Sequence, residues 1–135
     1  MPLSDGARAF LQEKRFAVLA TIGADSLPQQ TVMWYELRGD TIVMNTKVGR
    51  VKDRLLRRDP RASICVEDGQ RFVTIAGPIQ FVEDEATAQE DIRRLAVRYD
   101  GEEDGNQQAR ESFSKQQRVS LYLATDRVLE RGFDE

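Results

Sequence analysis

Short turns join consecutive strand-like segments of this chain, and they restrict its possible folds more than any other feature. The apolar segments Phe16–Ile22 and Gln29–Leu37 flank a turn at Gly23–Ser26. A second turn, at Arg38–Asp40, leads into the segment Thr41–Asn45. Parallel neighbours need a crossover of about a dozen residues or more, so connections this short predict an antiparallel meander.

Three further strand-like segments follow toward the C-terminus. Ala62–Glu67 and Arg118–Ala124 each predict a strand, and Phe72–Val82 predicts a long strand that Gly77–Pro78 interrupts. A proline inside a strand indicates an edge or a bulge, because it cannot donate a ladder hydrogen bond. Since Phe72–Val82 carries apolar residues on both faces, a half-solvated sheet does not suit it. A barrel whose outer wall is covered by helices or by a second subunit would bury both faces of this strand.

Apolar residues at helical spacing predict helices between and beyond these strands. Ser4 is a candidate N-cap for a first helix, Lys47–Arg58 contains a short one, and Asp84–Tyr99 predicts the clearest. We expect a polar loop at Asp100–Asn106 and one or two helical turns within Gln107–Ser114. The 135 residues suit a single α+β domain, residues 1–135, that is mainly β with about six antiparallel strands.

Charge is distributed unevenly along the chain, although the net charge is only −3. Residues 47–61 contain seven basic and two acidic residues, whereas residues 83–104 contain nine acidic residues and three arginines. The basic segment begins where a strand ends and a helix starts, which favours anions because helix N–H groups are unpaired there. Thr46, Arg50 and Lys52 can bind a phosphate at this junction. A solvated helix face is the alternative interpretation.

Composition excludes several kinds of chemistry. The chain has no histidine and one cysteine, so neither a Ser–His or Cys–His dyad, nor a zinc site, nor an internal disulfide is expected. The acidic net charge argues against a dedicated nucleic-acid binder. No segment approaches the ~20 apolar residues of a membrane span, and no signal peptide is evident, so we expect a cytoplasmic protein.

At Phe16–Gly23 and Pro28 the chain resembles the opening of the pyridoxamine-phosphate-oxidase-like split β-barrels. Asn45–Ile64 is similar to the segment that binds the cofactor phosphate in the actinobacterial deazaflavin-dependent branch of that family. The resemblance covers most of Phe16–Val82 and is looser beyond it. Residues 122–135 lack the C-terminal substrate-binding stretch of true pyridoxamine-phosphate oxidases, which argues against vitamin B6 chemistry.

The resemblance implies a six-stranded antiparallel split β-barrel with flanking helices, similar to FMN-binding folds. It implies a homodimer with two cofactor sites at the subunit interface. The implied cofactor is coenzyme F-420, an 8-hydroxy-5-deazaflavin with a phosphate and a polyglutamate tail, or else FMN. By position, Thr46, Arg50 and Lys52 would hold the phosphate, while Arg54 and Arg57 are candidates to meet the tail.

The implied activity is hydride transfer between reduced F-420 and a small organic acceptor. Gln30, Thr31, Val32 and Trp34 of the second strand would lie along the cofactor ring. A proton could come from solvent, from Tyr35 or from an arginine, so no catalytic residue is assigned. No metal is expected.

Three alternatives remain at this stage. An FMN-dependent oxidoreductase would use the same fold and the same phosphate site. A small barrel could instead bind single-stranded nucleic acid through the basic segment, but residues 47–61 contain no aromatic side chain on which bases could stack. The third alternative is a protein that carries or senses a cofactor without catalysing a reaction.

Overall fold

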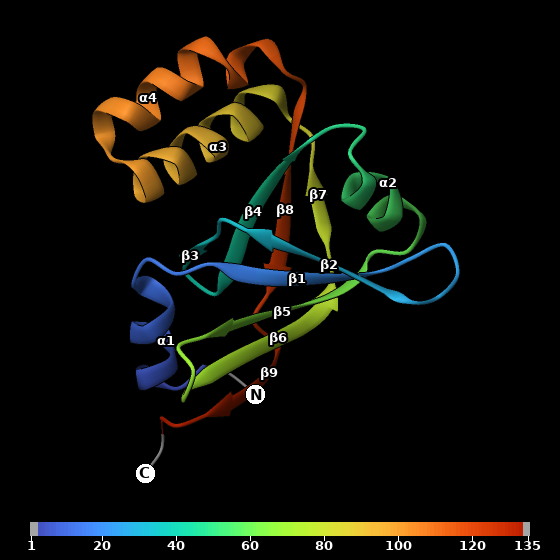
Figure 1. Ribbon diagram of the computed structural model, residues 1–135, viewed down its shortest axis with the longest axis vertical. Coiled ribbons are helices and arrows are strands. Elements are labelled where there is room, and N and C mark those ends of the chain that lie inside the picture. The colour runs from blue at the N-terminus through green and yellow to red at the C-terminus, as the bar shows by residue number, and fades with distance from the viewer. Residues whose placement is uncertain (1–2, 134–135) are drawn as a thin grey trace.

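The computed structural model describes residues 3–133, which form two antiparallel sheets and four α-helices (Figure 1). The larger sheet contains β1 (Ala17–Ile22), β2 (Pro28–Met33), β5 (Arg61–Glu67), β6 (Phe72–Pro78) and β9 (Arg127–Arg131), in the order β2-β1-β5-β6-β9. The smaller sheet contains β3 (Glu36–Arg38), β4 (Thr41–Lys47), β7 (Gln80–Val82) and β8 (Arg118–Ala124), in the order β3-β4-β8-β7. The expected mixed α+β class is confirmed.

Residues 3–133 form nine strands instead of about six, because two predicted strands divide between the sheets and β9 follows β8 as a separate strand. Gln29–Leu37 breaks into β2 and β3 at Tyr35, whose backbone N–H donates to the Tyr99 hydroxyl (3.1 Å) rather than to a strand. Phe72–Val82 breaks into β6 and β7 at Ile79, whose N–H donates to the Pro60 carbonyl (2.7 Å). The sequence predicted an interruption at Gly77–Pro78, but both residues still pair with β5, and the chain changes sheet one residue later, at Ile79.

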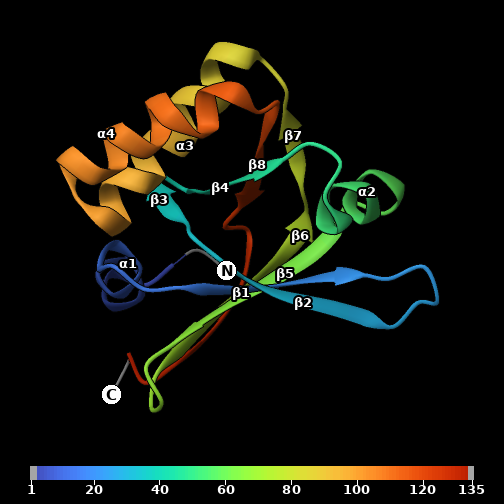
Figure 2. The ribbon, with the colours of Figure 1, turned by 45° about the horizontal axis from the view of Figure 1, so that its top comes forward.

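Three chain segments therefore pass directly from one sheet into the other: β2 into β3, β6 into β7 and β8 into β9. Within residues 3–133 the strand pairings do not close into a barrel. The core lies between the sheets and is built from side chains that both contribute, among them Leu19, Ile64 and Ile75 from the larger sheet and Ile42 and Leu121 from the smaller. Figure 2 shows the sheets crossing at an angle.

The helices are α1 (Asp5–Gln12), α2 (Val51–Arg58), α3 (Glu85–Asp100) and α4 (Glu102–Glu111). The Ser4 N-cap is confirmed, since its hydroxyl accepts the Ala7 N–H at 3.1 Å. Helices α3 and α4 pair and cover the smaller sheet, with α3 against β4 and β8 (Figures 1 and 2). None of the helices in the described part of the chain is both long enough and apolar enough to span a membrane.

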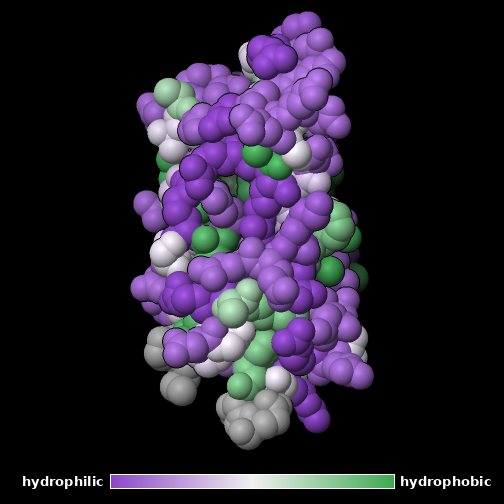
Figure 3. Space-filling view, turned by 90° about the vertical axis from the view of Figure 1, so that its left-hand side faces the viewer, coloured by the Kyte–Doolittle hydropathy of each residue, from purple (hydrophilic) through white to green (hydrophobic). Residues whose placement is uncertain are grey.

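The predicted loop at Asp100–Asn106 is wrong, because α4 begins at Glu102. Three acidic residues occupy its first turn, where they complement the helix dipole. Gly105 allows α4 to approach α3 closely, since a Cβ there would lie 2.5 Å from the Val97 nitrogen. Over these two helices the surface is mostly hydrophilic, as the upper part of Figure 3 shows.

Candidate functional site

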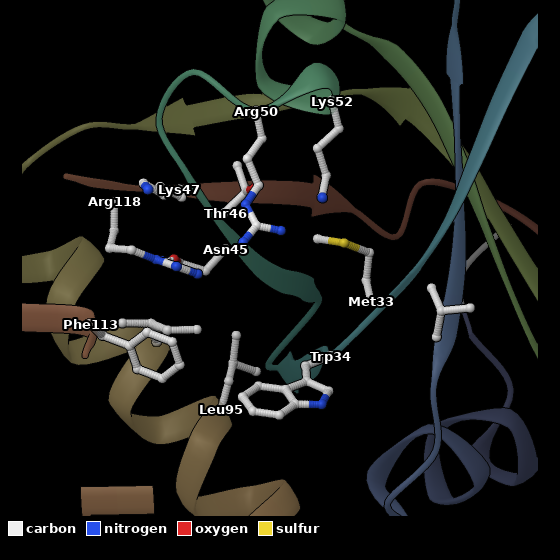
Figure 4. A pocket seen from close by; sticks show the side chains of 12 residues that line it. Met33, Trp34, Asn45, Thr46, Lys47, Arg50, Lys52, Leu95, Phe113 and Arg118 are labelled. Atoms are coloured by element: carbon white, nitrogen blue, oxygen red, sulfur yellow. Dashed lines mark hydrogen bonds between the residues drawn. The ribbon is translucent and has the colours of Figure 1, made fainter. Parts of the chain in front are cut away.

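A pocket of about 360 Å³ lies where the two sheets meet below the N-terminus of α2 (Figure 4). Strands β2, β4 and β8 contribute to its wall, together with α2, α3 and the turn around Phe113. The lining residues are Val32, Met33, Trp34, Asn45, Thr46, Lys47, Arg50, Lys52, Ile92, Leu95, Phe113 and Arg118. None of these residues is acidic, so the pocket carries a positive charge.

The turn between β4 and α2 is held by Asp53, which is 2% exposed. One carboxylate oxygen of Asp53 accepts the Gly49 N–H (2.8 Å), and the other accepts Nε of Arg57 (2.8 Å). Gly49 has φ +94°, a conformation that side-chain-bearing residues rarely adopt. The carboxylate is thus used within the turn and on Arg57, while Arg50 and Lys52 extend from the turn toward the pocket (Figure 4).

Arg118 reaches the same pocket from β8 and is only 8% exposed. Its Nε donates to Oδ1 of Asn45 (2.9 Å), its Nη1 donates to Oε1 of Gln116 (2.7 Å), and its guanidinium lies 4.9 Å from the centre of the Phe113 ring. All these partners are neutral. Burial, followed by repulsion from Arg50, lowers the pKa of Arg118 to about 10.

The pKa of Lys52 is lowered, as is that of Arg118. Burial lowers the pKa of its ammonium group, and the charges of Arg50 and Arg118 lower it further. Among residues 3–133, none of these three cations forms an ion pair with a carboxylate. Cations that repel one another and lack a counter-charge are stabilised by an anion. The pocket is therefore suited to a phosphate or a similar group.

The opposite wall of the pocket is apolar. Met33, Trp34, Ile92 and Leu95 line it, and the Trp34 indole stacks on Tyr99 with ring centres 5.2 Å apart and an interplanar angle of 7°. In Figure 4, Trp34 and Leu95 lie away from Arg50 and Lys52, Met33 lies between Lys52 and Trp34, and Phe113 lies beside Arg118. One end of the pocket thus suits an anion and the other a flat apolar group.

A second pocket of about 470 Å³ adjoins the first and shares Arg50 and Lys52 with it. Its other lining residues are Gln29, Gln30, Thr31, Gly49, Val51 and Arg54. This pocket also lacks acidic lining residues. The two pockets together extend the positive surface from β8 across the start of α2 to β2.

The structure gathers the residues that the sequence singled out. Thr46, Arg50, Lys52, Val32 and Trp34 all line the first pocket. The remaining two, Gln30 and Thr31, line only the second pocket.

Two expectations change with the structure. The Arg57 side chain forms ion pairs with Asp53 and Glu83 (2.8 and 3.0 Å) and does not line the second pocket. Arg54, the other candidate for the tail, does line it. Tyr35 is fully buried, its hydroxyl donates to the Leu11 carbonyl (2.8 Å), and burial raises its pKa to about 12. It does not line the pocket, so its hydroxyl is not placed to give a proton to a group bound there.

Sequence reasoning missed Arg118 and Asn45, which the pairing of β4 with β8 brings together. Lys47 lies opposite Arg118 in that ladder, and Asn45 lies opposite Ser120. The signal in the sequence that could have pointed to Arg118 is that this basic residue begins the predicted strand Arg118–Ala124. In residues 3–133 no cluster of three or more histidine, cysteine or acidic side chains could hold a metal ion.

Comparison with known proteins places this geometry in a family context. The family model described as pyridoxamine 5'-phosphate oxidase matches residues 3–131. A conserved hypothetical protein from Mycobacterium tuberculosis superposes with a TM-score of 0.80 and 29% identity, covering 95% of this chain and 84% of that one.

Two other solved structures share the fold at lower identity. A protein named F420 reductase has a TM-score of 0.74 and 22% identity, covering 94% of this chain and 98% of its own. The heme storage protein HutZ from Vibrio cholerae has a TM-score of 0.72 and 19% identity, covering 98% and 97%. At these identities the likeness concerns the fold alone.

Proposed function

The chain belongs to the pyridoxamine 5'-phosphate oxidase family, and we propose that it is an oxidoreductase that uses coenzyme F-420 to reduce a small organic acceptor. The observation that carries the proposal is the first pocket, in which three cations that form no ion pair with a carboxylate of residues 3–133 face an apolar wall. An anionic cofactor with a flat ring matches both ends of such a pocket.

The residues present fit this cofactor. Arg118 is buried among neutral partners and Lys52 is half-buried, so both gain a counter-charge when a phosphate binds. Arg50 and Arg118 can each bind a phosphate through parallel N–H groups, Lys52 adds a point charge, and the Thr46 hydroxyl adds a donor. These four side chains would hold the phosphate, while Trp34 and its apolar neighbours would lie along the ring.

When bound, reduced F-420 supplies a hydride to the acceptor, and the protein contributes binding and orientation. The apolar side chains Met33, Ile92 and Leu95 would exclude water from the ring end of the pocket. Fixed positive charge at the other end would set the direction in which the cofactor lies.

The second pocket favours F-420 over FMN. Arg54 lies there beside Arg50 and Lys52, and its guanidinium donates to the Gly49 carbonyl (2.9 Å). A polyglutamate tail that leaves the phosphate site would meet these cations, whereas FMN ends at its phosphate. FMN remains the second candidate, because the first pocket alone provides for its phosphate and its ring.

We further propose that the active form is a homodimer. Strand β2 is an edge strand, and its residues are mostly exposed, including Val32 at 65% although it lines the pocket. An apolar side chain exposed at the rim of a ligand pocket is suited to coverage by a partner subunit. Sedimentation of the purified protein would test this state directly.

A titration tests the proposed cofactor. Purified protein is titrated with F-420, with FMN, and with the deazaflavin nucleoside that lacks both phosphate and tail, following ring fluorescence. We expect F-420 to bind more tightly than FMN, and the nucleoside to bind at least tenfold more weakly than F-420, because it loses the charge-assisted hydrogen bonds. Preference for FMN would transfer the proposal to the flavin enzymes, and equal affinity for the nucleoside would contradict the phosphate site.

A further inference from the structure

A continuous chain of buried hydrogen bonds leads from the pocket to a carboxylate on α3. Arg118 Nε donates to Oδ1 of Asn45 (2.9 Å), and Nδ2 of Asn45 donates to Oγ of Ser120 (3.2 Å). The Ser120 hydroxyl donates in turn to Oδ2 of Asp91 (2.6 Å). The four side chains are between 0% and 8% exposed, so water does not compete with these bonds.

The two ends of this chain fix its direction. A guanidinium can only donate hydrogen bonds, and an ionised carboxylate can only accept them. The Ser120 hydroxyl has a single proton, which it donates in the hydrogen bond to Asp91. The Ser120 oxygen can therefore only accept from Asn45. The Asn45 amide must then turn its NH2 toward Ser120 and the Ala88 carbonyl (2.9 Å), which leaves its oxygen for Arg118.

We propose that Asp91 is a positioning residue for the anion site: through Ser120 and Asn45 it fixes the orientation in which the Arg118 guanidinium meets the bound anion. The inference rests on the proposed function for the identity of that anion, but the orientation itself is a property of the free protein. Asp91 does not line the first pocket, so its effect is transmitted rather than direct.

Tyr122 provides a matched control for Ser120. The Tyr122 hydroxyl donates to the same Asp91 oxygen at 2.7 Å, against 2.6 Å for Ser120. Ser120→Ala and Tyr122→Phe therefore each remove one hydroxyl donor from one carboxylate oxygen. Of the two, only Ser120 is also bonded to Asn45, so only its loss removes a hydrogen bond from the Asn45 amide, which then keeps the Ala88 carbonyl as its acceptor.

The experiment measures the orientation without any ligand. Hydrogen exchange of the Arg118 Nε–H, followed by NMR in the full-length protein, reports whether the bond to Asn45 is intact. We expect exchange to accelerate several-fold in Ser120→Ala and to remain at the wild-type rate in Tyr122→Phe. Thermal unfolding of both variants monitors the fold, and Asp91→Asn, which keeps the side-chain shape, is a second variant that should also accelerate exchange.

Binding of inorganic pyrophosphate and of F-420 completes the test. For both probes we expect Ser120→Ala to weaken affinity about threefold to tenfold, the contribution of one hydrogen bond, and Tyr122→Phe to leave it unchanged. Unchanged Arg118 exchange in Ser120→Ala, or equal effects of Ser120→Ala and Tyr122→Phe, would overturn the positioning role. Failure of wild-type protein to bind F-420, with the exchange difference intact, would overturn only the proposed function.

Discussion

Two groups of arginines lie on either side of α3 and differ in what surrounds them. On the pocket side, Arg50 and Arg118 have no carboxylate partner among residues 3–133, and Arg118 has its pKa lowered to about 10. On the other side, Arg38 pairs with Asp91 and Glu36 (3.0 and 2.9 Å), and Arg94 pairs with Glu36 (2.7 Å). Their hydrogen bonds to these carboxylates help raise the pKa values of Arg38 and Arg94, although burial opposes the rise.

The difference shows that a count of basic residues does not locate a binding site. The charge of a paired arginine is neutralised by a carboxylate of the protein, whereas the charge of an unpaired, buried arginine remains available to an anionic ligand. The surface around Arg38 and Arg94 is also hollowed, yet its lining includes Glu90 and Asp91. An anion would be repelled there, and this distinction is open to direct test.

The largest effect is expected from removing two pocket cations together. Arg50→Ala with Lys52→Ala should weaken F-420 binding by at least about 100-fold, because two charge-assisted hydrogen bonds are lost. The matched control is Arg93→Ala with Arg94→Ala, which removes two arginines that pair with Glu90 and Glu36 (2.6 and 2.7 Å) and should leave affinity within about twofold. Fluorescence titration measures both, and comparable losses in the two doubles would abolish the contrast between the regions.

Single methionine substitutions should separate binding from stability. Arg118→Met should weaken F-420 binding about tenfold to 100-fold while changing the free energy of unfolding by no more than about 1 kcal/mol. Arg38→Met should do the reverse, lowering stability by about 2 kcal/mol because the Asp91 carboxylate, 2% exposed, loses a charged partner. Urea unfolding and titration of both variants check this; a large stability loss in Arg118→Met would mean that its charge serves the fold.

Affinity should also depend on pH in a defined direction. The pKa of free Arg118, about 10, lies below the ordinary value of 12.5, and the bound anion requires the cation. Affinity is therefore nearly full up to about pH 9 and falls as the pH rises through 10, by about fourfold between pH 7.5 and 10.5 from Arg118 alone. Calorimetric titration of wild type and Arg118→Met would measure it, and an equal decline in the variant would assign the dependence to another group.

The smallest effect is expected for an exposed pair. Arg94→Ala removes the contact with Glu36, in which the arginine side chain is 45% exposed. Solvent screening limits its contribution to roughly 0.5 kcal/mol of stability, and F-420 affinity should not change. Thermal unfolding combined with titration provides the measurement, and any loss of affinity beyond twofold would show that the paired side contributes to the site.

Local sequence signals singled out three residues that line one end of the first pocket, but not the full lining of that end. Thr46, Arg50 and Lys52 follow one another across a strand end and a helix start, so spacing alone indicated their proximity. Arg118 joins them through the register of β4 with β8, which pairs it with Lys47. Long-range register depends on packing of the whole sheet and has no local signal.

The same limit explains the errors in the fold. The sequence of Gln29–Leu37 has the pattern of one uninterrupted strand. Only the hydrogen bonds of Tyr35 with α1 and with Tyr99 show that the chain changes sheets there. The acidic residues after Asp100 suggested a loop because an isolated helix of that composition is weak. Packing of Gly105 against α3 stabilises it, and such packing overrides local preference.

The first pocket lies across the seam between the two sheets, with walls from β2 on one side and from β4 and β8 on the other. Anything bound there holds the two layers together, and ligand at 100 times its dissociation constant adds about 2.7 kcal/mol to folding stability. A cell short of the ligand would keep this protein in a form that opens more often and is degraded sooner. Its abundance would then follow the supply of the proposed cofactor, without any change in synthesis.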